Sequence, residues 1–274
     1  MKWGIIGTGN MGQVLTHAFL QSQLLNQHDL YLTTRTMEKA YTLKEEFPNV
    51  QITDNVFDLI EEVDTIFLCV KPLEMVKLLQ EIKHVISKDQ LLVSITSGIS
   101  VNQIESIVNC QVARMVPSIT NRALSGVSLI TFGERVDPQR RELFYKRCKR
   151  FSEPIEIEEK QIRIASDMVS CGPAFFAFLA KKYIQEADSQ TAITTDEAST
   201  LMEKMFVGFG KLLAEKHYSL NELIEKVCVK GGITGVGIEA LEGRSDELFK
   251  QLIHSTHHKF SEDKKEIYKE VKVQ

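Results

Sequence analysis

The sequence predicts an α/β protein in which a doubly wound, parallel sheet over residues 1–160 is followed by an all-helical domain over residues 161–274. Two observations support this division. Short apolar runs alternate with helical patterns over the first 130 residues, which is typical of βαβ units. After Lys160 the period-2 signal ends, and the spacing of apolar residues is helical up to the end of the chain.

Each expected element follows from its own pattern. Alternating or continuous apolar runs bounded by turn residues predict strands at 3–6, 29–34, 50–53, 64–70, 91–96, 111–115, 127–132 and 154–158. Helical spacing predicts helices at 11–22, 38–46, 56–62, 73–86, 101–108 and 138–150 in the first part, and at 174–186, 195–216, 220–227, 237–241 and 245–271 in the second. Ser100, followed three residues later by Gln103, predicts a capped helix start.

The helix expected at 195–216 is apolar on most of its faces, since Leu201, Met205, Val207 and Leu212 do not share one side. A helical domain of about 110 residues rarely supplies a core around such a helix by itself. We therefore expect a second copy of the chain to cover it, which gives a homodimer or a larger homo-oligomer.

Composition excludes several classes of protein. The 274 residues carry 33 Lys and Arg against 37 Asp and Glu, a net charge of −4, so a nucleic-acid partner is not expected. No membrane partner is expected either, because no apolar stretch approaches the ~18 residues of a bilayer span. The chain also begins without a signal-peptide pattern, and its five cysteines form no Cys-x-x-Cys pair. These features predict a cytoplasmic protein with reduced thiols.

A glycine-rich turn predicts a dinucleotide site. Gly7, Thr8, Gly9, Asn10, Met11 and Gly12 follow the first strand and open the first helix. In a Gly-x-Gly-x-x-Gly turn the first glycine makes the tight turn, the second admits a pyrophosphate, and the third lets helix and strand pack closely. The free N–H groups of the helix start then face the anion. This context, strand before and helix after, predicts a Rossmann-type domain.

The end of the second strand favours NADPH over NADH. An NAD site places an Asp or Glu there for the ribose 2′-hydroxyl, whereas this chain has Thr34 and Arg35. A guanidinium can pair with a 2′-phosphate. Two further strand ends, at Val70-Lys71-Pro72 and Ser97-Gly98, point into the same crevice and are expected to contact the cofactor.

Taken together, these motifs resemble the pyrroline-5-carboxylate reductase family, which reduces a cyclic imine to proline with NAD(P)H. Within that family the chain is most similar to the relatives encoded beside late-competence operons. The matching segments are Gly7–Gly12, Asp54-Asn55, Cys69–Pro72, Ser94–Ser100, Arg114–Pro117, Gly172–Ala174 and Gly231–Thr234 with Gly237.

The resemblance implies roles for particular residues. Asn55 would contact the ribose end of the cofactor, while Lys71 and Pro72 would border the nicotinamide. The loop with Gly231, Gly232 and Thr234 would hold the substrate carboxylate, because a Gly-Gly turn leading into a helix exposes N–H groups and Thr234 adds a hydroxyl. Lys230, where this chain departs from the family, brings a cation that could bind the carboxylate as well. Thr234 and Lys71 are the residues expected to support catalysis, and no metal is expected.

The substrate side departs from the family. The family's Ser-Pro-Gly-Gly-Thr-Thr is replaced by Val229-Lys230-Gly231-Gly232-Ile233-Thr234, and its Pro-Asn-Thr-Pro by Pro117-Ser118-Ile119-Thr120. An NADP-binding regulatory or sensor protein without efficient turnover is therefore the alternative. A 3-hydroxyacid dehydrogenase would need a lysine and asparagine signature, and Lys182 with Gln185 completes it only in part. The helical histidines His254, His257 and His258 are expected to be a solvated face.

Overall fold

The computed structural model describes residues 1–272, with side chains up to Lys269. It divides into two compact units, one formed by 1–173 with 256–272 and the other by 174–255. Each unit is described by itself below. The boundary expected after residue 160 stays a prediction. The end of the chain belongs to the first unit because Ile267 is part of the core of that unit.

The first unit is built on an eight-stranded sheet in the order β3-β2-β1-β4-β5-β6-β7-β8. Its strands are β1 Trp3–Ile6, β2 Leu30–Thr33, β3 Gln51–Ile52, β4 Thr65–Leu68, β5 Leu91–Ser94, β6 Gln111–Val116, β7 Val127–Phe132 and β8 Glu153–Glu156. The helices between them are α1 Asn10–Gln21, α2 Met37–Glu46, α3 Val56–Glu62, α4 Pro72–Ile82, α5 Val101–Glu105 and α6 Pro138–Cys148, with short turns η1 Gln27–Asp29 and η2 Ile119–Ala123.

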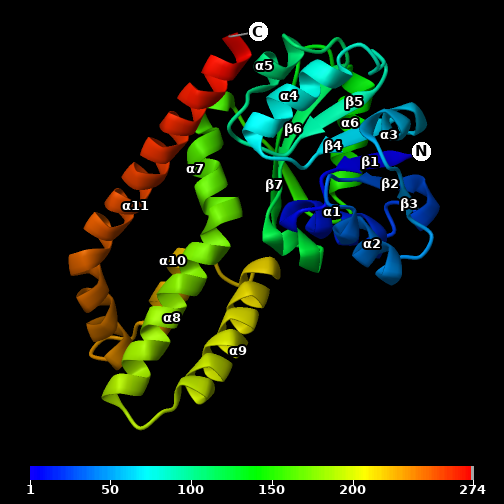
Figure 1. Ribbon diagram of the computed structural model, residues 1–274. Coiled ribbons are helices and arrows are strands. Elements are labelled where there is room, and N and C mark those ends of the chain that lie inside the picture. The colour runs from blue at the N-terminus through cyan, green and yellow to red at the C-terminus, as the bar shows by residue number, and fades with distance from the viewer. Residues whose placement is uncertain (273–274) are drawn as a thin grey trace. The chain divides into compact units, whose positions relative to one another are not determined.

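The sheet is buried on both faces, as the continuous apolar runs of its strands predict. On one face Trp3, Phe67 and Val93 pack with α1, α2 and α6, and on the other Ile66, Leu68 and Leu92 pack with α3, α4 and α5. Trp3 lies at the centre of the first core, with its ring 4.9 Å from Phe19 and 5.1 Å from Phe67. Figure 1 shows helices on both sides of the sheet. The doubly wound fold class is confirmed.

One strand corrects the expected parallel order, because β7 runs antiparallel to β6. Only residues 117–126 connect the two strands, and the short turn η2 occupies half of that segment. A parallel crossover needs a dozen or more residues, usually including a helix, so this connection returns the chain in the opposite direction.

Three helical turns lead out of the sheet: η3 Glu159–Gln161, α7 Ile162–Ser166 and the π-helical turn η4 Asp167–Cys171. The helices α8 Gly172–Gln190, α9 Thr195–Ala214, α10 Leu220–Val227 and α11 Ile233–Lys272 follow. The two final helices expected at 237–241 and 245–271 are one continuous helix. Gly243 lies inside it. A glycine in a helix interior costs about 1 kcal/mol of stability relative to Ala, and this 40-residue helix tolerates that cost.

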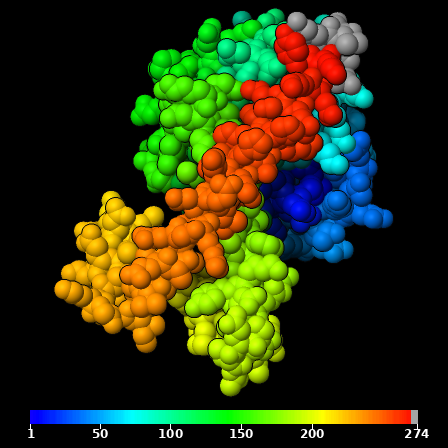
Figure 2. All heavy atoms as spheres, turned by 90° about the vertical axis from the view of Figure 1, so that its left-hand side faces the viewer, coloured from blue at the N-terminus to red at the C-terminus, as the bar shows by residue number. Residues whose placement is uncertain are grey.

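The last turns of α11 belong to the first unit. Ile267 is 1% exposed and is part of the core under α4 and α5. Its Cδ1 atom would lie 3.3 Å from a Cβ atom at Gly98. Figure 2 shows this end of the chain, in red, against the cyan and green atoms of the sheet unit. The apolar spacing of 245–271 predicts a helix but not which surface it covers.

The second unit leaves apolar side chains uncovered within one chain. Along α9 only Ala198 is buried, while Leu201 and Val207 are each 61% exposed. A single chain therefore does not bury α9, and the expectation that a second copy of the chain covers this helix stays a prediction. Its apolar surface exceeds what the short α10 and its neighbours cover.

One helical stretch, Glu159–Gln190, is long and apolar enough to cross a membrane by length and composition alone, with a mean hydropathy of 1.3 over 18 residues, of which 22% are buried. This corrects the expectation that no stretch approaches that length. A single such helix is weak evidence for a membrane, because an apolar helix of a soluble assembly meets the same criterion.

Candidate functional site

The glycine turn after β1 has the backbone geometry that a dinucleotide cradle requires. Gly7 has φ +102°, and its N–H donates to the Thr33 carbonyl at 2.8 Å. A Cβ atom at Gly7 would lie 2.6 Å from the Cys69 carbonyl oxygen, and one at Gly12 would lie 2.1 Å from the Gly7 carbonyl oxygen. Both positions therefore accept glycine alone. The first and third glycines close the turn against β4 and α1.

Gly9 differs from the other two glycines. No heavy atom lies within 4 Å of a Cβ built there, and its φ of −69° is open to any residue. Its C-terminal neighbour Asn10 begins α1, whose first N–H groups receive no side-chain cap from Gly9. The open space and the uncapped helix start fit a pyrophosphate. Thr8 is fully buried, and its Oγ1 atom has no hydrogen-bond partner.

The remaining expected cofactor residues lie at the carboxyl ends of neighbouring strands. Thr34 and Arg35 follow β2, Asn55 follows β3, Val70 to Pro72 follow β4, and Ser97 and Gly98 follow β5. Asn55 caps α3 by accepting from the Asp58 backbone N–H at 2.9 Å, and its Nδ2 donates to the Asp58 carboxylate at 2.7 Å. Gly98 N–H donates to Thr96 Oγ1 at 3.2 Å. These strands are neighbours in the sheet, so the sequence-predicted residues share one edge.

The charges at this edge include one pair that the sequence did not predict. Arg35 is 83% exposed, and its Nη2 donates to Glu74 Oε1 at 2.7 Å. Lys71 is exposed at the start of α4. Burial raises the pKa of the Cys69 thiol, so the group beside the glycine turn stays neutral. The cradle is therefore built from backbone N–H groups and exposed cations.

A second group of polar contacts lies at the π-helical turn η4. Ser118 Oγ donates to the Val169 carbonyl at 2.8 Å, and Ser170 Oγ donates to the Pro117 carbonyl at 2.7 Å. The segment 117–118 and the turn η4 therefore contact each other. Single-turn π-helical insertions are often found at functional sites.

Charged groups lie at that turn and in the neighbouring strand β6, and sequence reasoning missed them. Arg163 Nη2 donates to Asp167 at 2.6 Å, and Thr256 Oγ1 donates to the same carboxylate at 2.8 Å. His257 Nε2 lies 3.6 Å from Asp167, so its face of α11 is not simply solvated as expected. The fully buried Arg114 pairs with Glu159 at 2.7 Å. An arginine inside an otherwise apolar strand was the available signal.

The expected carboxylate turn lies in the second unit. Gly231 has φ +75°, and Gly232 N–H donates to the Val229 carbonyl at 2.9 Å. Lys230 and Thr234 are both exposed, and α11 begins at Ile233. The local geometry is thus a glycine turn opening a long helix. Lys230 to Thr234 and the cradle residues belong to different units.

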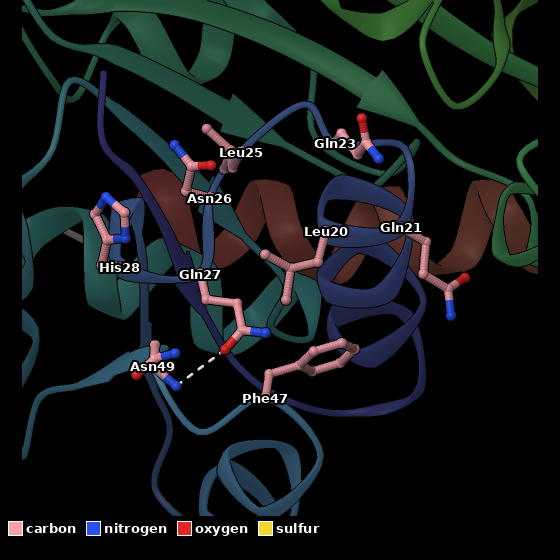
Figure 3. Close-up of a pocket in the computed structure, with 9 residues that line it drawn as sticks. All are labelled: Leu20, Gln21, Gln23, Leu25, Asn26, Gln27, His28, Phe47 and Asn49. Carbon is pink, nitrogen blue, oxygen red and sulfur yellow. Dashed lines mark hydrogen bonds between the residues drawn. The ribbon is translucent and has the colours of Figure 1, made fainter.

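A hollow of about 410 Å³ lies elsewhere, lined by residues that precede β2 and β3. Figure 3 shows Leu20, Gln27, His28, Phe47 and Asn49 around it. Since it adjoins the amino ends of these strands, it is at the sheet edge opposite the cradle. Gln27 Oε1 already accepts from the Asn49 N–H at 3.0 Å. This hollow therefore has no part in the dinucleotide site.

Residues 1–272 contain no group of three or more His, Cys, Asp or Glu side chains arranged to hold a metal ion. All five cysteines are free thiols. The chemistry available at the cradle edge is therefore that of backbone donors, hydroxyls and cations.

Comparison with protein families supports this description of both parts. Residues 2–98 match a family described as NADP oxidoreductase, coenzyme F420-dependent, and residues 159–263 match the family described as pyrroline-5-carboxylate reductase dimerisation. A nucleotide cradle on a Rossmann-type sheet, followed by this helical domain, defines an NAD(P)-binding protein of the oxidoreductase class.

Relatives over nearly the full length identify the family. ComE operon protein 4 of Bacillus subtilis is 43% identical over 96% of this chain and 96% of its own, and pyrroline-5-carboxylate reductase 3 of the same organism is 27% identical over 94% of each. The structure of Plasmodium falciparum pyrroline carboxylate reductase with NADP bound has a TM-score of 0.80 at 21% identity, covering 97% of this chain and 98% of that one. The chain belongs to the pyrroline-5-carboxylate reductase family.

Proposed function

We propose that the protein reduces 1-pyrroline-5-carboxylate, or a close cyclic imine carboxylate, to proline or the matching cyclic amine with NADPH. The observation that carries the proposal is the glycine turn, in which Gly7 and Gly12 are closed by backbone contacts while Gly9 is open. Membership of the reductase family over almost the whole chain supports the same reaction.

The cofactor contacts are assigned by strand order. The turn from Gly7 to Gly12 would hold the pyrophosphate, and Asn55 the ribose end, with Thr34 and Arg35 at the 2′-phosphate. Val70, Lys71, Pro72, Ser97 and Gly98 would border the nicotinamide. The structure of a relative with NADP bound supports NADPH as the cofactor, and NADH is the less favoured cofactor. When bound, NADPH supplies the hydride.

The protein's own task in the reaction is to hold the substrate and exclude water. Reduction adds a hydride to the carbon of the C=N bond and a proton to its nitrogen. The turn Lys230 to Thr234 would bind the carboxylate through N–H groups, the Thr234 hydroxyl and the Lys230 cation. Lys71 is assigned to the reacting end of the cofactor.

A homodimer is part of the proposal. The match to the dimerisation family and the exposed apolar side chains of α9 support it, since a second copy would cover them. We assign the protein to the cytoplasm, where NADPH is available and five free thiols stay reduced.

Steady-state oxidation of NADPH by the full-length protein with pyrroline-5-carboxylate tests the proposal. We expect turnover, and a loss of at least about tenfold in kcat/KM for Thr234→Ala, because a site built to hydrogen-bond its substrate discriminates strongly. Thr42→Ala, which removes an exposed hydroxyl on α2, is the control and should leave kcat/KM unchanged.

A different outcome would favour the alternative function. If the protein binds NADPH but oxidises it no faster than Thr234→Ala does, the reductase proposal fails and a regulatory or sensor protein takes its place. The Val229-Lys230 and Ile119-Thr120 substitutions in the substrate segments favour that alternative over other classes.

A further inference from the structure

The ion pair between Arg35 and Glu74 joins two elements at the cofactor edge. Arg35 follows β2, and Glu74 is the third residue of α4, which begins at Pro72. The distance from Nη2 to Oε1 is 2.7 Å, and the Glu74 side chain is 37% exposed. The cation predicted to receive a 2′-phosphate therefore already has a carboxylate partner.

The position of Glu74 is favourable for reasons independent of Arg35. The first turn of a helix carries unpaired N–H groups and a partial positive charge, which stabilise an acidic side chain. The N-cap residue of α4, Lys71, supplies no side-chain hydrogen bond to these groups. Glu74 is thus held near the start of α4, where its carboxylate reaches across to the end of β2.

A 2′-phosphate would meet both charges. It carries about −1.5 to −2 charges at neutral pH. Arg35 attracts it, while the Glu74 carboxylate repels it and occupies one amino group of the guanidinium. A ribose with a free 2′-hydroxyl carries no such charge, so it neither competes for Arg35 nor is repelled by Glu74.

We propose that Glu74 is a specificity-determining residue that competes with the cofactor 2′-phosphate for Arg35 and so reduces the preference of the protein for NADPH over NADH. This inference rests on the proposed function, because it assumes that Arg35 receives the 2′-phosphate. It goes beyond that function by assigning a role to an α4 residue that does not belong to the glycine turn.

The size of the effect follows from the exposure of the pair. An exposed ion pair contributes about two- to fivefold in an equilibrium constant, and removing repulsion of a doubly charged phosphate adds to this. Glu74→Gln keeps the size of the side chain and removes its charge. We expect it to bind NADPH about three- to tenfold more tightly and to bind NADH within about twofold of the unchanged protein.

The experiment measures the dissociation constants of NADPH and NADH by calorimetry for the full-length protein and its variants. Arg35→Met should weaken NADPH at least about tenfold and NADH within about twofold. In Arg35→Met with Glu74→Gln the gain from the second change should shrink to the part that comes from removing the repulsion between Glu74 and the phosphate. Glu62→Gln is the matched control, because Glu62 forms a solvent-exposed ion pair with Lys2, with an N–O distance of 2.6 Å, and does not lie at the cofactor edge.

The outcomes separate the inference from the function on which it rests. If Glu74→Gln weakens NADPH, Glu74 orients Arg35 instead of competing, and the inference is overturned. Equal changes for NADPH and NADH overturn it as well, while the reductase proposal survives. If the unchanged protein binds neither NADPH nor NADH, both the inference about Glu74 and the reductase proposal are refuted.

Discussion

Alanine at Gly12 should destabilise the protein, whereas alanine at Gly9 should weaken NADPH binding with little effect on stability, although the two glycines are three residues apart in one turn. At Gly12 the new Cβ atom would lie 2.1 Å from the Gly7 carbonyl oxygen, about an ångström inside ordinary contact. Because this neighbour is backbone, helix and turn must move apart. Overpacking of this kind costs about 3 kcal/mol, and the better helix propensity of alanine offsets about 1 kcal/mol. We expect a net loss of about 2 kcal/mol.

At Gly9 the same change should leave stability nearly unaltered. Its Cβ atom meets nothing within 4 Å, and φ of −69° with ψ of −171° suits alanine. Alanine restricts the unfolded chain more than glycine does, which raises the free energy of unfolding by about 0.4–1 kcal/mol. Alanine is also a poorer N-cap residue than glycine, which lowers the free energy of unfolding by a similar amount. The methyl group would nevertheless occupy the space that the pyrophosphate needs, so NADPH binding should weaken at least about tenfold.

Urea unfolding and NADPH calorimetry measure both quantities. Trp3 is the one tryptophan of the chain and is fully buried in the core of the sheet, so its fluorescence reports unfolding of this unit. The reasoning is refuted if Gly12→Ala is as stable as Gly9→Ala, or if Gly9→Ala binds NADPH as tightly as the unchanged protein.

Two further predictions concern stability. Ile267→Ala removes three buried carbon atoms and should lower the free energy of unfolding by about 2–4 kcal/mol in the Trp3 assay. Ile155→Ala is the control, since this side chain is 43% exposed, and should lower the free energy of unfolding by under about 1 kcal/mol. Equal losses would mean that the end of α11 does not pack on the sheet. Burial, with a smaller contribution from the charge of Arg122, lowers the pKa of His17. The folded protein therefore binds this proton more weakly than the unfolded chain, and stability should be full above about pH 6.5 and fall as the pH drops further. His17→Gln should reduce the loss in urea midpoint between about pH 7.5 and about pH 5.5, and an unchanged loss would exclude His17 as its cause.

Much of the fold could be predicted because its signals are local. Strand and helix periodicity identified every strand of the sheet within a few residues, and the capping box at Ser100 is present as expected. The antiparallel β7 was missed, since strand direction depends on the connection and not on the pattern inside the strand. The single helix α11 was predicted as two helices, at 237–241 and 245–271.

The candidate site also contains residues that the sequence predicted and one that it did not. Residues that follow strand ends, such as Gly7, Arg35 and Gly98, were found because parallel strands bring their carboxyl ends to one edge. Glu74 was missed because it lies on an ordinary charged helix start. Its importance comes from a partner 39 residues away in the chain.

The sequence by itself determined the glycine turn, the strand and helix periods, and the change to an all-helical pattern after Lys160, because each depends on residues close together along the chain. Only the tertiary structure decided that Glu74 faces Arg35, that Ser118 and Ser170 bind the opposite segment, and that Ile267 is buried in the sheet unit. These contacts join distant parts of the chain, and the pattern of an exposed charge or an apolar helix face does not specify which surface it will meet.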